Sequence, residues 1–251
     1  MPQWGMVVDL DRCNGCSACV VACQSENNIP FAGEEQAEKG RSITWLRMER
    51  HTEGSWPNVK TRFLPVLCQH CDEAPCVPVC PVGATYENPE GINAQVNARC
   101  VGLRFCANAC PYSVRYFNFE PPSWPEPLTK HLNPDVLVRE RGHIEKCTFC
   151  VQRIRRAKDR AQDESRPPRD GDVTPACAQS CPAQAMVFGD LEDPASRVSR
   201  LSRDPRAFRL MEELGTRPRV TYLKRRRDES PERKDGPQAD RRDAVATKDG
   251  L

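Results

Sequence analysis

The cysteines of this chain are gathered in four tight runs, and their spacing constrains the fold more than any other feature. The runs are Cys13-x2-Cys16-x2-Cys19-x3-Cys23, Cys68-x2-Cys71-x4-Cys76-x3-Cys80-Pro81, Cys100-x2-Leu103-x2-Cys106-x3-Cys110-Pro111, and Cys147-x2-Cys150 continued after an insertion by Cys177-x3-Cys181-Pro182. Closely spaced thiols of this kind let a single loop wrap three corners of an iron–sulfur cubane. We therefore expect each run to wrap a metal–sulfur site.

Close thiols followed by a Cys-Pro pair are typical of bacterial ferredoxin runs, in which the last cysteine binds the other cluster of a pair. Four runs predict four iron–sulfur clusters and a protein that conducts electrons. Structural zinc is the alternative, but zinc ribbons close one tetrahedral ion with two CxxC pairs and do not need the third thiol of run one. The odd count of 15 cysteines and the lack of a visible signal peptide disfavour a disulfide framework. His70, inside run two, is expected to pack beside its site rather than to bind metal.

Leu103 occupies the position of run three where run one has Cys16. Leucine offers no donor to a corner iron, so the simplest outcome is a three-iron cluster held by three thiolates. The core of such a cluster is all-ferric when oxidised, whereas a cubane begins half-reduced, so this site should accept an electron at a higher potential. The alternatives are a fourth iron that binds water, Asn108 or another neighbouring side chain.

Runs one and three are internal copies of each other. Their alignment pairs Arg12 with Arg99, Gly15 with Gly102, Cys13 with Cys100, Cys19 with Cys106, Ala22 with Ala109, and Cys23 with Cys110. The expected fold class is therefore α+β, built from duplicated bacterial-type two-[4Fe-4S] ferredoxin modules with inserted loops and small β-hairpin elements.

The composition favours a fold that metal holds together. Only 38% of the residues are hydrophobic and 23 are proline, so we expect cluster binding to supply folding energy. The formal charge of +2 treats the thiols as neutral; four clusters with their thiolates bring the holoprotein to about −6, which gives no support to nucleic-acid binding. Arg12, Arg99 and Lys146 precede the first cysteines of runs one, three and four, and either offset cluster charge or are ordinary solvated cations.

Several segments outside the runs have their own signals. Residues 42–50 and 60–67 alternate like a strand pair, and residues 151–161 predict a basic surface helix. The proline-rich insertion, residues 121–139, is expected to be a docking loop, and the charged tail, residues 224–251, is expected to be disordered. No segment approaches the roughly 18 apolar residues that span a bilayer, so we expect no direct transmembrane insertion.

The chain resembles the four-cluster iron–sulfur subunits of the dimethyl-sulfoxide-reductase superfamily over about residues 4–190. The likeness rests on the motifs Val8-Asp9-Leu10-Asp11-Arg12-Cys13, Gln69-His70-Cys71, Ala74-Pro75-Cys76, Cys106-Ala107-Asn108-Ala109-Cys110-Pro111-Tyr112 and Glu145-Lys146-Cys147-Thr148-Phe149-Cys150. Similar members are the beta-type subunits of polysulfide, tetrathionate and nitrate reductases and the iron–sulfur part of alternative complex III. A non-cysteine at position 103 is similar to the last two, although leucine itself is unexpected there.

The resemblance implies that runs one and four share two clusters and that runs two and three share the other two. The implied ligand sets are Cys13, Cys16, Cys19 and Cys181 for the first [4Fe-4S] cluster; Cys147, Cys150, Cys177 and Cys23 for the second; Cys68, Cys71, Cys76 and Cys110 for the third; and Cys100, Cys106 and Cys80 for a [3Fe-4S] cluster, with Leu103 at the missing-ligand position. All 15 cysteines are then used. No catalytic residue and no substrate site are implied within this chain.

The implied organisation pairs residues 1–30 and 140–190 in one ferredoxin module, places residues 60–120 in the other, and leaves residues 191–223 as a C-terminal extension. The implied function is to wire electrons through three [4Fe-4S] clusters and one [3Fe-4S] cluster, between a molybdopterin-type catalytic subunit and a polytopic quinone-binding membrane subunit. The chain would then be peripheral on the bacterial cytoplasmic membrane, on either face, through its partners. A free-standing soluble polyferredoxin is the alternative.

Overall fold

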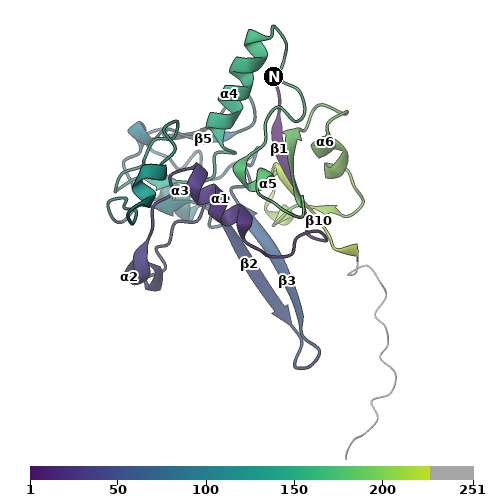
Figure 1. Ribbon diagram of the computed structural model, residues 1–251, viewed down its shortest axis with the longest axis horizontal. Coiled ribbons are helices and arrows are strands. Elements are labelled where there is room, and N and C mark those ends of the chain that lie inside the picture. The colour runs from purple at the N-terminus through teal and green to yellow at the C-terminus, as the bar shows by residue number, and fades with distance from the viewer. Residues whose placement is uncertain (227–251) are drawn as a thin grey trace, which may run out of the picture.

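The computed structural model describes residues 1–226 (Figure 1). Most of the predicted disordered tail, from residue 227 onward, lies outside the described residues. Within residues 1–226, no helix combines the length and the apolar character that crossing a bilayer requires.

A four-stranded sheet joins three distant parts of the chain. Its strands follow the order β8 (Met186–Asp190), β1 (Trp4–Asp9), β10 (Val220–Leu223) and β9 (Ala207–Phe208). Strand β1 pairs antiparallel with β8 and parallel with β10, while β9 pairs antiparallel with β10. The extension after residue 190 therefore completes the sheet that begins at the N-terminus, and helix α6 (Arg197–Ser202) packs on it through the buried Val198.

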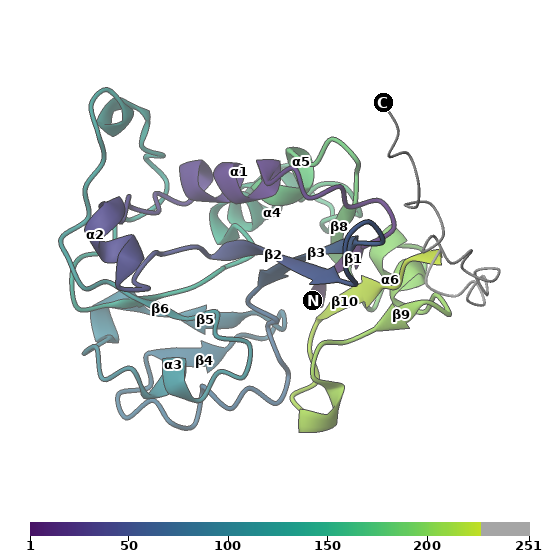
Figure 2. The same ribbon diagram turned by 90° about the horizontal axis from the view of Figure 1, so that it is seen from below.

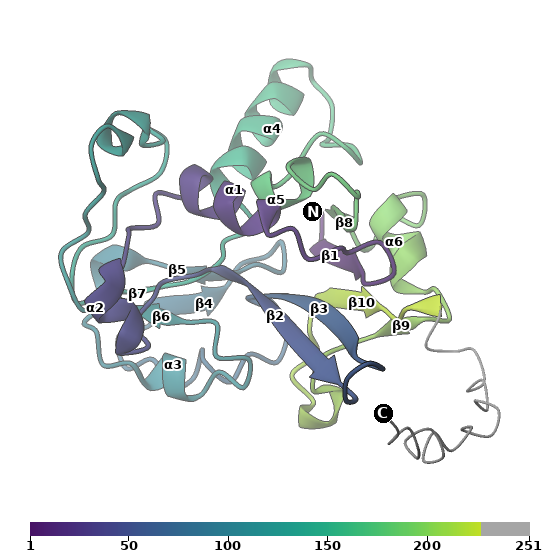
Figure 3. The same cartoon turned by 60° about the horizontal axis from the view of Figure 1, so that its bottom comes forward.

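Three helices accompany runs one and four. Helix α1 (Ala18–Glu26) contains Cys19 and Cys23, and the short α5 (Ala176–Gln179) contains Cys177. The two lie side by side, as Figures 2 and 3 show. Helix α4 (Val151–Asp163) lies in the insertion of run four, directly after Cys150, and buries Ile154, Ala157 and Ala161. The helix predicted at residues 151–161 is thus confirmed, with two further residues at its end.

Runs two and three lie among small elements in another part of the molecule (Figure 2). These elements are β4 (Thr85–Glu87), β5 (Asn93–Gln95), a 3-10 turn (Asn97–Arg99), α3 (Phe105–Asn108), β6 (Tyr116–Phe117) and β7 (Ile144–Glu145). Strand β4 pairs with β5 and β6 pairs with β7, both antiparallel. Because β7 ends two residues before Cys147, it connects this region directly to run four.

The predicted strand pair between runs one and two is a hairpin that projects from the body (Figure 1). Strand β2 (Leu46–Glu53) pairs antiparallel with β3 (Lys60–Leu67), in register from Leu46 opposite Leu67 to Glu53 opposite Lys60. The first strand begins at Leu46 rather than at residue 42. The preceding Trp45 is buried instead, and its indole N–H donates to Glu145 at 2.9 Å.

Three further elements lie outside the sheets. Helix α2 (Gly33–Glu38) has no buried residue. One 3-10 turn (Leu128–His131) lies in the proline-rich insertion, and another (Glu212–Leu214) lies between β9 and β10. The insertion is held to the end of α1 by Asn28, whose amide donates to the carbonyl oxygens of Asn133 at 2.8 Å and Val136 at 2.7 Å. The Asn28 side-chain oxygen also accepts from the Asn133 N–H at 2.7 Å.

We predict that Asn28→Ala loosens this insertion locally, around Asn133 and Val136, without unfolding the protein. The change removes three hydrogen bonds from a side chain that is 2% exposed, each worth about 1 kcal/mol. Amide hydrogen exchange at Asn133 and Val136 should accelerate while the visible spectrum stays the same. Thr129→Ala, which removes a bond to Glu126 within the insertion, is the control; equal exchange rates in both variants would contradict the anchoring role.

Candidate metal centres

The same left-handed backbone turn recurs in the first part of every cysteine run. It lies two residues after the first cysteine, at Gly15 (φ 75°), His70 (φ 45°), Gly102 (φ 72°) and Phe149 (φ 54°). A Cβ at Gly15 would lie 2.5 Å from the Phe63 ring, and one at Gly102 would lie 2.3 Å from the Gly142 carbonyl oxygen. The glycines that pair in the two internal copies are therefore required by both backbone angle and space.

A second turn recurs at the Cys-Pro pairs. The N–H of Ala84 donates to Cys80 Sγ at 3.2 Å, and that of Ala185 donates to Cys181 Sγ at 3.3 Å. Burial raises the pKa of Cys110, and the Val114 N–H opposes this in the same way. N–H groups aimed at sulfur favour the thiolate, which is the form that binds metal.

The first group of cysteines joins run one to run four. Cys13, Cys16, Cys19 and Cys181 line one cavity. Burial, followed by the charges of the other three cysteines, raises the pKa of Cys19 to about 11. Cys16 is exposed, so this group reaches the protein surface.

The second group lies deeper and joins the same two runs, but it takes one cysteine from run one and three from run four. Burial raises the pKa of Cys23 well above its usual value, and the charges of Cys147, Cys177 and Cys150 raise it further. The Asn27 amide lies 3.6 Å from Cys23 Sγ and 3.8 Å from Cys150 Sγ, and donates to both. Run one has no proline after Cys23, so this side chain supplies the donor that the Cys-Pro turn provides elsewhere.

The third and fourth groups join runs two and three. Burial, followed by the charge of Cys68 and then those of Cys76 and Cys110, raises the pKa of Cys71 to about 12, while Thr216 opposes the shift. Cys80, Cys100 and Cys106 line a separate cavity to which Leu103 contributes its alkyl side chain. Asn108, the alternative donor, does not line this cavity.

The four groups follow one another in a single row. Beyond the dominant effect of burial, the pKa of Cys177 is raised by the charge of Cys19, and that of Cys147 by the charge of Cys68. Across the last junction, the charge of Cys76 raises the pKa of Cys106. The first group is therefore next to the second, the second to the third, and the third to the fourth.

Between the second and third groups, two strained residues stack on each other. The rings of His70 and Phe149 lie 3.8 Å apart between centroids and 24° from parallel. Both are buried, and burial, together with the positive charges of Lys146, Arg115 and Arg219, holds the pKa of His70 well below its usual value. The ring is therefore neutral and packs beside the cysteines.

The two ends of the row have different surfaces. Around the fourth group, large apolar side chains are exposed; they are Val79, Val82, Val101, Leu103 and Phe105. Helix α3, which begins at Phe105 of this set, lies on a different side of the molecule from the C-terminal end of β10 (Figure 3). We call this set of five residues the apolar patch.

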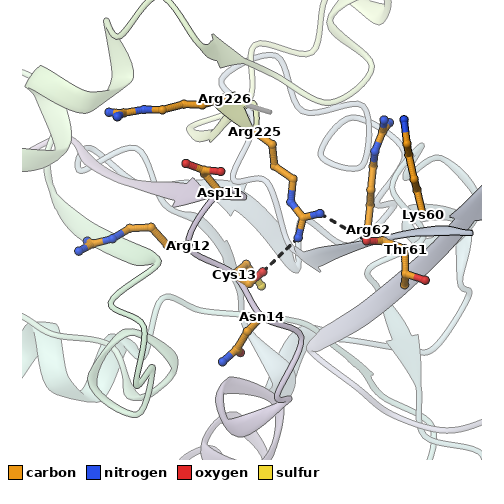
Figure 4. Close-up of a pocket in the computed structure, with 9 residues that line it drawn as sticks. All are labelled: Asp11, Arg12, Cys13, Asn14, Lys60, Thr61, Arg62, Arg225 and Arg226. Atoms are coloured by element: carbon orange, nitrogen blue, oxygen red, sulfur yellow. Dashed lines mark hydrogen bonds between the residues drawn. The ribbon is translucent and has the colours of Figure 1, made fainter. Parts of the chain in front are cut away.

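Beside the first group lies a cavity of about 800 Å³ that is rich in cations (Figure 4). Its charged lining residues are Asp11, Arg12, Lys60, Arg62, Arg225 and Arg226. Arg225 donates to the carbonyl oxygens of Leu10 at 3.0 Å, Thr61 at 3.3 Å and Cys13 at 3.5 Å, so it holds the hairpin against run one. We call this site the cationic pocket.

The comparisons with known proteins agree with this geometry. Two models of a 4Fe-4S dicluster domain match, one over residues 12–84 and one over residues 59–124. The iron–sulfur cluster-binding subunit of menaquinone reductase from Nitratidesulfovibrio vulgaris is 49% identical, over 89% of this chain and 89% of that protein. The iron–sulfur subunit of arsenate respiratory reductase from a Shewanella species is 37% identical (88% and 95%), and iron–sulfur subunit 1 of an Hdr-like menaquinol oxidoreductase from Archaeoglobus fulgidus is 37% identical (88% and 83%).

The chain belongs to the iron–sulfur electron-transfer subunits of the dimethyl-sulfoxide-reductase superfamily. The predicted resemblance is confirmed, and the prediction of an electron-transfer subunit is favoured over that of a free ferredoxin. The residues fit [4Fe-4S] clusters, because groups of thiols face common cavities and backbone N–H groups point at their sulfurs. Sequence reasoning missed Asn27, although its position four residues after a run's last cysteine matches the donors of the Cys-Pro turns.

Serine substitutions can test whether each cluster takes its ligands from a single cysteine run or from two runs. Cys19 and Cys23 lie on the same helix but in different groups. We predict that Cys23→Ser and Cys177→Ser each remove the same component of the EPR spectrum of the reduced protein, because both lose a thiolate of one cluster. Cys19→Ser should remove another.

Ser180→Ala, beside the fourth run's last cysteine, serves as the control and should leave every component in place. The crossed arrangement is wrong if Cys23→Ser and Cys19→Ser abolish the same component.

Proposed function

We propose that this chain wires electrons through three [4Fe-4S] clusters and one [3Fe-4S] cluster between a molybdopterin-type catalytic subunit and a quinone-interacting membrane subunit. The observation that best supports this proposal is the single row of four cysteine groups, which has a different surface at each end. Bound clusters supply one-electron carriers over a wide range of potentials, from about −700 to +450 mV. The chain would be peripheral on the bacterial cytoplasmic membrane through these partners.

The ligands we propose are the four groups themselves. They are Cys13, Cys16, Cys19 and Cys181; Cys23, Cys147, Cys150 and Cys177; Cys68, Cys71, Cys76 and Cys110; and Cys80, Cys100 and Cys106 for the three-iron cluster. Residues 1–30 with 140–190, and residues 60–120, are then two ferredoxin modules. The extension to residue 223 supports the first module through β9 and β10.

The apolar patch supports an interface with a hydrophobic partner at the three-iron end. Val101, Leu103 and Phe105 are all more than half exposed, at 61%, 53% and 55%. Contiguous apolar surface of this kind marks interaction sites in soluble proteins. Two relatives are named for menaquinone or menaquinol reactions, which supports a quinone-handling membrane subunit as the partner.

The cationic pocket supports an acidic partner at the other end. Complementary charges speed the association of a partner and fix its orientation, and a like charge set against them costs binding energy. The pocket adjoins Cys13 and lies beside the exposed Cys16, so a partner docked there would approach the first cluster. We assign this face to the catalytic subunit, and the hairpin residue Lys60 to its rim.

We predict that Leu103→Cys converts the three-iron cluster to a cubane. The oxidised three-iron core has an odd number of electrons and is EPR-active, so its signal in the oxidised protein should disappear, and the potential of the site should fall. Val101→Cys adds a thiol to the same loop away from the missing-ligand position and should leave the signal in place. An unchanged signal in Leu103→Cys with the thiol present would count against the three-iron assignment.

We also predict that Lys60→Glu weakens the catalytic subunit's binding about tenfold, as expected for reversing a charge at an interface. The loss should shrink as salt rises, because ions screen exposed charges. The measurement is the catalytic subunit retained on the tagged chain over a salt series. Arg155→Glu, which reverses an exposed charge on α4, is the control. If both variants retained the same amount of catalytic subunit, the assigned face would be contradicted.

A further inference from the structure

Two cations are buried in the middle of the row of cysteine groups without a carboxylate partner among residues 1–226. Lys146 is 1% exposed and Arg115 is 6% exposed. The Lys146 ammonium donates to the carbonyl oxygens of Asn93 and Cys147. A buried charge is costly unless an opposite charge compensates it, so these two side chains need an anion that neutral carbonyl groups do not provide.

Among residues 1–226, the oxygen atoms that accept hydrogen bonds from the Arg115 guanidinium are likewise neutral. It donates to Thr85 Oγ1 and Asn93 Oδ1 at 2.7 Å each, and to Gln95 Oε1 at 3.0 Å. Asn93 thus contacts both cations, one through its backbone oxygen and the other through its side chain. Its amide also donates to Cys76 Sγ at 3.6 Å, which places the whole assembly against the third cysteine group.

The anionic groups that act most strongly on Arg115 are cysteine sulfurs. Burial opposes the charge of Arg115, but the thiolates of Cys76, Cys68 and Cys106 outweigh it and raise the pKa of the guanidinium. These cysteines belong to the third and fourth groups, so Arg115 lies where the two groups meet. Lys146 opposes the effect of burial on the pKa of Cys147, in the second group. Its hydrogen bond to Asn93, whose amide donates to Cys76 Sγ, places it beside the third group as well.

We propose that Lys146 and Arg115 are the internal counter-charges of the clusters held by the second, third and fourth cysteine groups, and that they raise the reduction potentials of those clusters relative to the first. The inference rests on the proposed ligand sets. Reduction adds negative charge, and a fixed positive charge in a poorly polarisable interior stabilises it far more than one in water. Arg12 and Arg99, which also precede cysteine runs, are exposed, so solvent screens them.

Arg115→Gln and Arg99→Gln form a matched pair for testing this proposal. Each removes one cation near the fourth cysteine group, one buried and the other exposed. In an EPR-monitored redox titration of the purified complex, Arg115→Gln should shift the midpoint potentials of the third and three-iron clusters downward and leave that of the first cluster unchanged. Arg99→Gln should produce a much smaller shift, and Arg115→Lys, which keeps the charge, should restore most of the wild-type potential.

Gln95→Glu covers the case in which Arg115→Gln does not retain its clusters. It sets a carboxylate of the same size against the guanidinium, so it should also lower the three-iron potential in a fully loaded protein. The proposal would be overturned if variants that retain all their clusters kept the wild-type midpoint potentials. It would also be overturned if Arg99→Gln and Arg115→Gln shifted these potentials equally. Failure of the underlying ligand sets is distinguishable, because it would change the iron content and EPR components of the unaltered chain.

Discussion

The fold depends on cysteines from distant parts of the chain meeting at common sites. Cys23 of the first run lies among three cysteines of the fourth, and Cys181 of the fourth lies among three of the first. The main hydrophobic core includes cysteines from runs one, two and four alongside its aromatic and aliphatic residues. In a chain with 38% hydrophobic residues, metal bound at these crossings can supply folding energy that the apolar core alone would not.

The same meetings of distant cysteines arrange the four cysteine groups in the row that our proposal requires. Because neighbouring groups share a helix or a turn, such as α1 between the first and second groups, their spacing is set by regular backbone rather than by flexible loops. Exposed sites occur at the ends of the row, at Cys16 and at the apolar patch, while the second group is buried. A buried middle with two distinct ends suits an electron-transfer subunit, and two relatives are named as iron–sulfur subunits of a menaquinone reductase and of an arsenate respiratory reductase.

Local signals in the sequence predicted the local parts of this structure. The strand at residues 60–67, the helix at 151–161 and the paired glycines at 15 and 102 each follow from alternation, periodicity or backbone geometry within a few residues. The family resemblance, rather than any local pattern, implied the sets of cysteines that line common cavities. The ligation of metal by these groups remains a prediction.

Long-range features were not predictable in this way. Strand β10 has four residues, and its parallel pairing with β1 depends on tertiary contacts that no local pattern encodes. Nothing near Arg115 in the sequence separates it from the many exposed arginines, because its burial arises from β4 and β5. Lys146, Arg12 and Arg99 looked equivalent as residues preceding cysteine runs, and only the fold shows that Lys146 alone of the three is buried.

The central claim is the crossed row of four clusters, and diffraction at the iron absorption edge tests it most directly. An anomalous map from anaerobically grown crystals should show four iron sites in one line, the second between Cys23 and Cys147 and the last, smaller one beside Leu103. Iron sites confined within single cysteine runs, or fewer than four of them, would contradict the account.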